Sequence, residues 1–221
     1  MFGPSSALKS SKSHCYSGIT GALTVPFNPT TSKYTISYDG KSIETTVTDK
    51  ATIVDQWVQG INLQYPPNSS VIVGLGIEES PTKSKSATLH LCIDDKCLIL
   101  QLFHIVDFPL FLKNFLMNPN LYFVGVGVAH KIYNLKYEYD IHCGGVHADI
   151  KKLAMEKWPG RFNKPGLKDL AKELLGLSMK KPKLVSMSNW ENRVLSIAQV
   201  EYGCIHAYVS SKIGSMLLKD G

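Results

Sequence analysis

The sequence predicts one α/β domain built on a mixed β-sheet flanked by helices, and three observations support this. β-rich runs come first, strands then alternate with helices, and helical patterns fill the last third of the chain. The 221 residues suffice for one sizeable core and hardly for two. A hydrophobic content of 44% and a charged content of 19% are typical of a globular protein.

The first 32 residues differ in composition from the rest of the chain. They are rich in Ser, Thr, Gly and Pro, and no acidic residue precedes Asp39. We therefore expect a flexible N-terminal tail over residues 1–32 and a folded domain over residues 33–221. The tail lacks the basic start and apolar block of a secretory signal. Because it is Ser-rich and acid-poor, organelle targeting by this segment stays open.

The first predicted elements are a hairpin and a helix. Residues 34–38 and 42–47 are β-rich runs on either side of Asp39-Gly40, a dipeptide typical of a tight hairpin turn. Apolar residues then recur with helical spacing over residues 51–63. We expect Asp49 to cap this helix.

Three strands are predicted next, over residues 71–75, 87–93 and 97–103. The first is continuously apolar, as in a strand buried on both faces, whereas the second alternates. Cys92 and Cys97 flank the short turn between the last two strands. The five cysteines are odd in number and widely spaced, which favours reduced thiols over a disulfide framework or a zinc site.

The rest of the chain is predicted to contain one more strand among several helices. A helix, a buried strand and four further helices cover, in that order, residues 108–117, 121–124, 128–137, 146–157, 167–175 and 194–218. No apolar run approaches the length needed to span a bilayer, so we expect no membrane partner. Together with the thiols, this favours a cytoplasmic or nuclear protein.

Four segments carry a resemblance to a known family: residues 55–57, 71–78, 123–131 and 202–210. Their order and spacing resemble the motifs of the DEDDy-type 3′–5′ exonucleases. The resemblance is strongest to the small plant proteins similar to the Werner-syndrome exonuclease domain. It covers the chain from about residue 33 to the end, and it implies a ribonuclease H-like mixed sheet, the DnaQ-like exonuclease fold.

The chemistry of this family uses four carboxylates around two divalent metal ions, which activate a water and hold the scissile phosphate. The first motif is Asp-x-Glu in active members, and here it reads Gly76-Ile77-Glu78, so only the glutamate is kept. The aspartate of the second motif falls on Lys131. The third motif keeps Tyr202, but its aspartate falls on His206.

Three of the four carboxylates are therefore replaced, and we predict that the Mg²⁺ or Mn²⁺ site is lost and that the protein uses no metal cofactor. Mg²⁺ is a hard ion that relies on oxygen ligands, and an ammonium group at position 131 would repel it. None of the nearby acidic residues lies at a motif position; these are Glu79, Asp94, Asp95, Asp140 and Asp149.

The favoured functional hypothesis is a nucleic-acid-binding or regulatory pseudo-nuclease. Lys131 could hold a phosphate in place of a metal ion, with Arg161 and Lys164 as further contacts. The formal charge of +6 suits a polyanion such as single-stranded RNA or DNA, although most surface lysines are simply solvated. No base-reading motif distinguishes RNA from DNA.

Two other readings stay open. In the first, the altered cleft performs metal-free chemistry with Lys131, Glu78 and His206 as acid–base groups beside Tyr202. An ion pair between Lys131 and Glu78 is a simpler use of the same residues. In the second, metal-dependent exonuclease activity persists. The resemblance also implies a homo-oligomer, because plant relatives form rings, and mixed rings with active paralogues would allow regulation.

Overall fold

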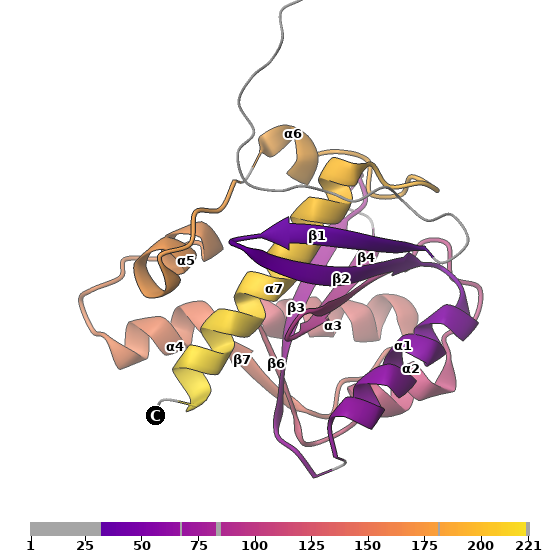
Figure 1. Ribbon diagram of the computed structural model, residues 1–221, viewed down its shortest axis with the longest axis horizontal. Helices are drawn as coiled ribbons and strands as arrows, with labels where there is room; N and C mark the ends of the chain where they lie inside the picture. Colours follow the sequence, from indigo (N-terminus) through magenta and orange to yellow (C-terminus); the bar gives the residue numbers. More distant parts are fainter. Residues whose placement is uncertain (1–31, 67, 83–84, 181, 220–221) are drawn as a thin grey trace, which may run out of the picture.

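A seven-stranded mixed β-sheet organises the protein (Figure 1). Its strand order is β1-β2-β5-β4-β3-β6-β7. The computed structural model describes residues 32–66, 68–82, 85–180 and 182–219. The expected tail over residues 1–32 therefore lies almost wholly outside the described residues.

The strands pair as a mixed sheet should. They are β1 (Lys33–Tyr38), β2 (Lys41–Thr48), β3 (Val71–Glu79), β4 (Ser86–Ile93), β5 (Lys96–Gln101), β6 (Leu121–Gly125) and β7 (Val146–Asp149). The pairs β1–β2, β3–β4 and β4–β5 are antiparallel, and β2–β5, β3–β6 and β6–β7 are parallel. Asp39 and Gly40 both have positive φ, as a type I′ hairpin turn requires. The predicted hairpins are confirmed.

Helices cover both faces of the sheet (Figure 1). They are α1 (Ala51–Gln64), α2 (Leu110–Leu116), α3 (Val128–Tyr139), α4 (Ile150–Lys157), α5 (Leu167–Leu175), α6 (Lys183–Ser186) and α7 (Ile197–Lys219). Helices α1, α2 and α3 contribute to one hydrophobic cluster, and α4, α5 and α7 contribute to the other. In the part of the chain that the structure describes, no helix is both long and apolar enough to cross a membrane.

The prediction of one helix over residues 146–157 is wrong. Residues 146–149 form the edge strand β7, which pairs in parallel with β6, and α4 begins only at Ile150. Asp149 makes the change from strand to helix. Its backbone is extended, and its carboxylate accepts hydrogen bonds from the backbone N–H groups of Lys151 and Lys152.

One smaller prediction also needs correction. Asp49 does not cap α1: the N-cap residue is Lys50, which makes no side-chain cap, and Asp49 instead forms a salt bridge with Arg193 at 2.9 Å. In β4, the alternation noted in the sequence puts Thr88 and His90 on one face. All eight residues of that strand are nevertheless buried, because α7 packs over the face that carries Thr88 and His90.

Helix α7 lies directly on the sheet and crosses it in Figure 1. Gly74 in β3 permits this close approach, since a Cβ atom there would lie 1.9 Å from the backbone oxygen of Ala207. Nearer the start of α7, Gly203 packs against the ring of His90, which pairs with Gly76 of β3. The first half of α7 is thereby held above the carboxyl end of β3.

Candidate functional site

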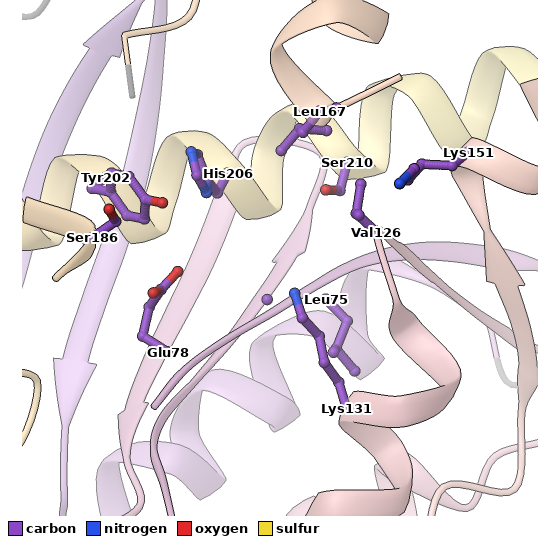
Figure 2. A pocket seen from close by; sticks show the side chains of 12 residues that line it. Leu75, Glu78, Val126, Lys131, Lys151, Leu167, Ser186, Tyr202, His206 and Ser210 are labelled. Atoms are coloured by element: carbon purple, nitrogen blue, oxygen red, sulfur yellow. The ribbon is translucent and has the colours of Figure 1, made fainter. Parts of the chain in front are cut away.

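A cavity of about 510 Å³ opens where the carboxyl end of β3 meets the starts of α3 and α4 and the middle of α7 (Figure 2). All four candidate catalytic residues predicted from the sequence line it: Glu78, Lys131, Tyr202 and His206. The structure thus brings together residues up to 128 positions apart in the sequence, 206 − 78 = 128. Lys151, which no motif indicated, also lines the cavity.

Each of these side chains is placed by its element. Gly76 and Glu78 are two residues apart on β3 and line the same cavity, as alternation along a strand requires. The pairing register of β3 with β4 shifts between Glu78 and Glu79, so the regular pairing ends here, and Glu79 is exposed. The sequence prediction that Glu79 cannot replace a lost ligand agrees with this position outside the cavity lining.

Helix α7 contributes an aromatic pair to the cavity. Tyr202 and His206 are four residues apart, so they lie one turn apart on the same face, and their ring centroids are 3.9 Å apart. Burial, together with the nearby Glu78 carboxylate, raises the pKa of Tyr202, while a hydrogen bond with Ser186 acts in the opposite direction. The phenol is therefore protonated at neutral pH.

His90 lies beneath the floor of the cavity and is completely buried. Its Nε2 atom is 2.9 Å from the Thr88 hydroxyl, and among the described residues its Nδ1 atom has no hydrogen-bond partner. Burial, with smaller contributions from Lys131 and His206, lowers the pKa of His90 to about 3. The imidazole is therefore neutral at physiological pH.

The imidazole of His90 fills space that two glycines leave open. A Cβ atom on Gly76 would lie 3.3 Å from His90 Nδ1, and one on Gly203 would lie 2.7 Å from His90 Cε1. The ring of Trp190 lies 5.6 Å away and closes the side of this space. Gly76, the residue on which the resemblance places the first-motif aspartate, is thus backed by a buried histidine.

The cavity is polarised. In the view of Figure 2, Glu78 and Tyr202 lie at one end, and Lys131 and Lys151 lie toward the other. The starts of the two helices that carry these lysines are tied together by Asp149. One carboxylate oxygen accepts a hydrogen bond from the Gly127 N–H group at 2.8 Å, and the other accepts one from the Lys151 N–H group at 2.9 Å.

The two other predicted nucleic-acid contacts, Arg161 and Lys164, lie outside the residues that line the cavity. Both belong to the loop between α4 and α5, and both are exposed. The Arg161 guanidinium packs over the rings of Trp158 and Phe162, at 5.5 and 5.4 Å from the ring centroids. The same loop reaches the cavity through Gly166.

The acidic residues near the motifs have other partners or positions. Asp94 lies in the β4–β5 turn and accepts a hydrogen bond from Tyr65, Asp140 ends α3, and Asp149 caps α4. Among the cavity-lining residues of the described chain, Glu78 alone carries a carboxylate. The described residues contain no group of three His, Cys, Asp or Glu side chains placed to hold a metal ion.

Known proteins with similar sequences are exonucleases. The profile of the 3′–5′ exonuclease family matches residues 69–219. The chain is 29% identical over 171 residues to a 3′–5′ exonuclease of Arabidopsis thaliana, covering 72% of this chain and 58% of the relative. It is 26% identical over 169 residues to the bifunctional 3′–5′ exonuclease/ATP-dependent helicase WRN of Mus musculus, covering 72% and 11%. This chain therefore spans less than two thirds of either relative.

Solved structures show the same fold. Escherichia coli RNase D, an exoribonuclease involved in structured RNA processing, superposes with a TM-score of 0.66 at 16% identity, over 80% of this chain and 44% of that one. Brucella melitensis NrnC superposes with a TM-score of 0.59 at 18% identity, over 70% of this chain and 75% of that one. The predicted ribonuclease H-like, DnaQ-like architecture is confirmed, and the chain belongs to the 3′–5′ exonuclease family.

Proposed function

We propose that this protein binds the ends of single-stranded nucleic acid in the cavity without metal-dependent cleavage, as a pseudo-nuclease of its family. One observation carries the proposal. Lys131, the residue on which the resemblance places the second-motif aspartate, projects into the cavity, and Glu78 is the one carboxylate in the described lining. By the resemblance, an ammonium group replaces a carboxylate that would hold a metal ion, and this reversed charge suits a phosphate directly.

The divalent ions that the family implies do not fit these residues. Two-metal hydrolysis needs several carboxylate oxygens to hold both ions, and this cavity offers the single carboxylate of Glu78. The ammonium groups of Lys131 and Lys151 line the same space. At an effective dielectric constant of about 20, an ammonium about 4 Å from a divalent ion repels it by about 8 kcal/mol. Cleavage by bound metal ions is therefore not part of the proposed function.

Single-stranded RNA should remain intact when it is incubated with the purified protein. The reason is that Mg²⁺ and Mn²⁺ are both hard cations that need several oxygen ligands, and the cavity offers one carboxylate. The measurement is a denaturing gel of 5′-labelled RNA, with each metal ion and with EDTA, and with single-stranded DNA in parallel. A ladder shortened from the 3′ end that needs metal and disappears in Glu78→Gln would disprove the proposal. Cleavage that persists in EDTA would instead favour the metal-free enzyme.

Reversing the charge of Lys131 should weaken nucleic-acid binding. We expect Lys131→Glu to lower the affinity for single-stranded RNA about 10-fold or more, because an attraction of about 1.4 kcal/mol is lost and a repulsion is added. Fluorescence anisotropy with labelled RNA in EDTA, at two salt concentrations, measures the change.

The matched control for this measurement is Lys136→Glu. Lys136 lies on the same helix, is exposed and does not line the cavity, and its substitution changes the net charge equally. We expect it to lower the affinity less than 3-fold, as a solvated surface charge does. Equal losses in the two variants would show that the protein binds RNA through its overall charge and not through the cavity.

A further inference from the structure

We infer that the lysine end of the cavity is a binding site for a phosphate monoester, so that the protein prefers nucleic-acid ends that carry a terminal 3′-phosphate. The inference deepens the proposed function and rests on it for the source of the ligand. It concerns Lys131, Lys151 and Ser210, which come from three different helices and line one cavity.

The first support is the distribution of charge. Two ammonium groups and one carboxylate line the cavity, which gives a formal charge of 2 − 1 = +1 before any contribution from His206. In the view of Figure 2, Glu78 lies across the cavity from Lys151, and Ser210 of α7 lines the cavity on the side of Lys151. An anion is therefore attracted to the lysine end, where the Ser210 hydroxyl can donate a hydrogen bond, and is repelled from the Glu78 end.

The second support is that the lysine end is built into the fold. The Asp149 carboxylate accepts hydrogen bonds from the backbone N–H groups of Gly127 and Lys151. Gly127 lies four residues before Lys131 in the sequence. Gly127 has a φ of 66°, so the chain enters α3 through a left-handed turn fixed by this hydrogen bond. Ser210 is buried on α7. Backbones fixed in advance lower the entropic cost of binding a small anion between them.

The third support is the number of charges. A phosphate monoester carries a charge of about −1.5 to −2 at pH 7, because its second pKa is about 6. An internal phosphodiester carries a single negative charge. The two ammonium groups of Lys131 and Lys151 match the monoester, so a chain end that bears a 3′-phosphate should outcompete a 3′-hydroxyl end. A free nucleoside monophosphate offers the same chemistry.

Two labelled RNAs of one sequence test the inference, one ending in a 3′-hydroxyl and the other in a 3′-phosphate. We expect the wild-type protein to bind the phosphorylated RNA at least 5-fold more tightly in anisotropy titrations without metal. Lys151→Ala should reduce this preference below 2-fold. The matched control is Lys152→Ala, because Lys152 is the next residue of α4, is exposed and does not line the cavity. The Lys152→Ala variant should keep the wild-type preference for the 3′-phosphorylated RNA.

The outcomes separate the inference from the proposed function. Equal affinity for the two RNAs would overturn the monoester site and leave the binding of RNA ends standing. A preference that survives both Lys131→Ala and Lys151→Ala would show that the phosphate is recognised elsewhere, which also overturns the site. If neither RNA binds, but uridine 5′-monophosphate raises the melting temperature of the wild type and not of Lys151→Ala, the site stands with a free nucleotide as its ligand. The proposed function then fails.

Discussion

Gly74→Ala is expected to destabilise the protein by about 3 kcal/mol or more, at the upper end of what overpacking a core costs. Gly74 lies in β3 between β4 and β6, where a Cβ atom would be 1.9 Å from the Ala207 oxygen and 2.8 Å from the Ser211 nitrogen. Both atoms belong to the backbone of α7, so no side-chain rotation can relieve the overlap. The helix must move off the sheet, and it carries Tyr202 and His206 with it.

Urea denaturation followed by circular dichroism measures this change. Gly60→Ala is the matched control, because Gly60 lies within α1 and a Cβ atom there would meet nothing within 4 Å. Alanine at that position should stabilise the protein by about 0.5 to 1 kcal/mol, since glycine is the poorer helix former. A Gly74→Ala variant as stable as the wild type would contradict the direct contact between α7 and β3.

The motif residues could be placed from the sequence because each follows a strong local pattern. The apolar run predicted a strand over residues 71–75, which lies within β3 (Val71–Glu79), and the motif that follows this run identified Glu78. Tyr202 and His206 have the spacing of one helical turn in a long helix. The resemblance to the exonuclease motifs supplied the remaining step, since only a shared fold predicts that segments so far apart in sequence meet at one cavity.

The lysine end of the cavity could not be predicted in the same way. The short run Val-His-Ala-Asp reads as part of a helix, because four residues carry too little pattern to separate a strand from a helix start. Its pairing with β6 and the cap formed by Asp149 place Lys151 at the cavity. From the sequence alone, Lys151 and Lys152 are equivalent members of a basic pair, and only the structure distinguishes them.

His90 is the second residue that the sequence could not reveal. The register of β3 against β4 places His90 opposite Gly76. Gly203 in α7 leaves the space that the imidazole ring of His90 occupies. No local pattern encodes either relation. A carboxylate introduced at Gly76 would therefore meet the packing behind the cleft as well as its lining, and this matters for any attempt to build a metal site there.

Introducing carboxylates at the three positions where the resemblance places the family's aspartates is expected to create metal binding. The triple substitution Gly76→Asp, Lys131→Asp and His206→Asp changes the formal charge of the lining from 2 − 1 = +1 to 1 − 4 = −3 and recreates the ligand set of the family. Isothermal calorimetry should detect Mn²⁺ binding in the triple variant and none in the wild type.

The contribution of Gly76 to this result can be separated from that of the other two positions. The double variant Lys131→Asp/His206→Asp keeps the glycine and should bind Mn²⁺ at least 10-fold more weakly than the triple variant, because it lacks one ligand. In the triple variant, the new Cβ atom lies 3.3 Å from His90 Nδ1, so the ring must shift by a few tenths of an ångström. The orphaned Nδ1 atom can then pair with the new carboxylate if it carries the proton. A triple variant that melts like the wild type and yet binds no Mn²⁺ would show that the cleft no longer has the family geometry.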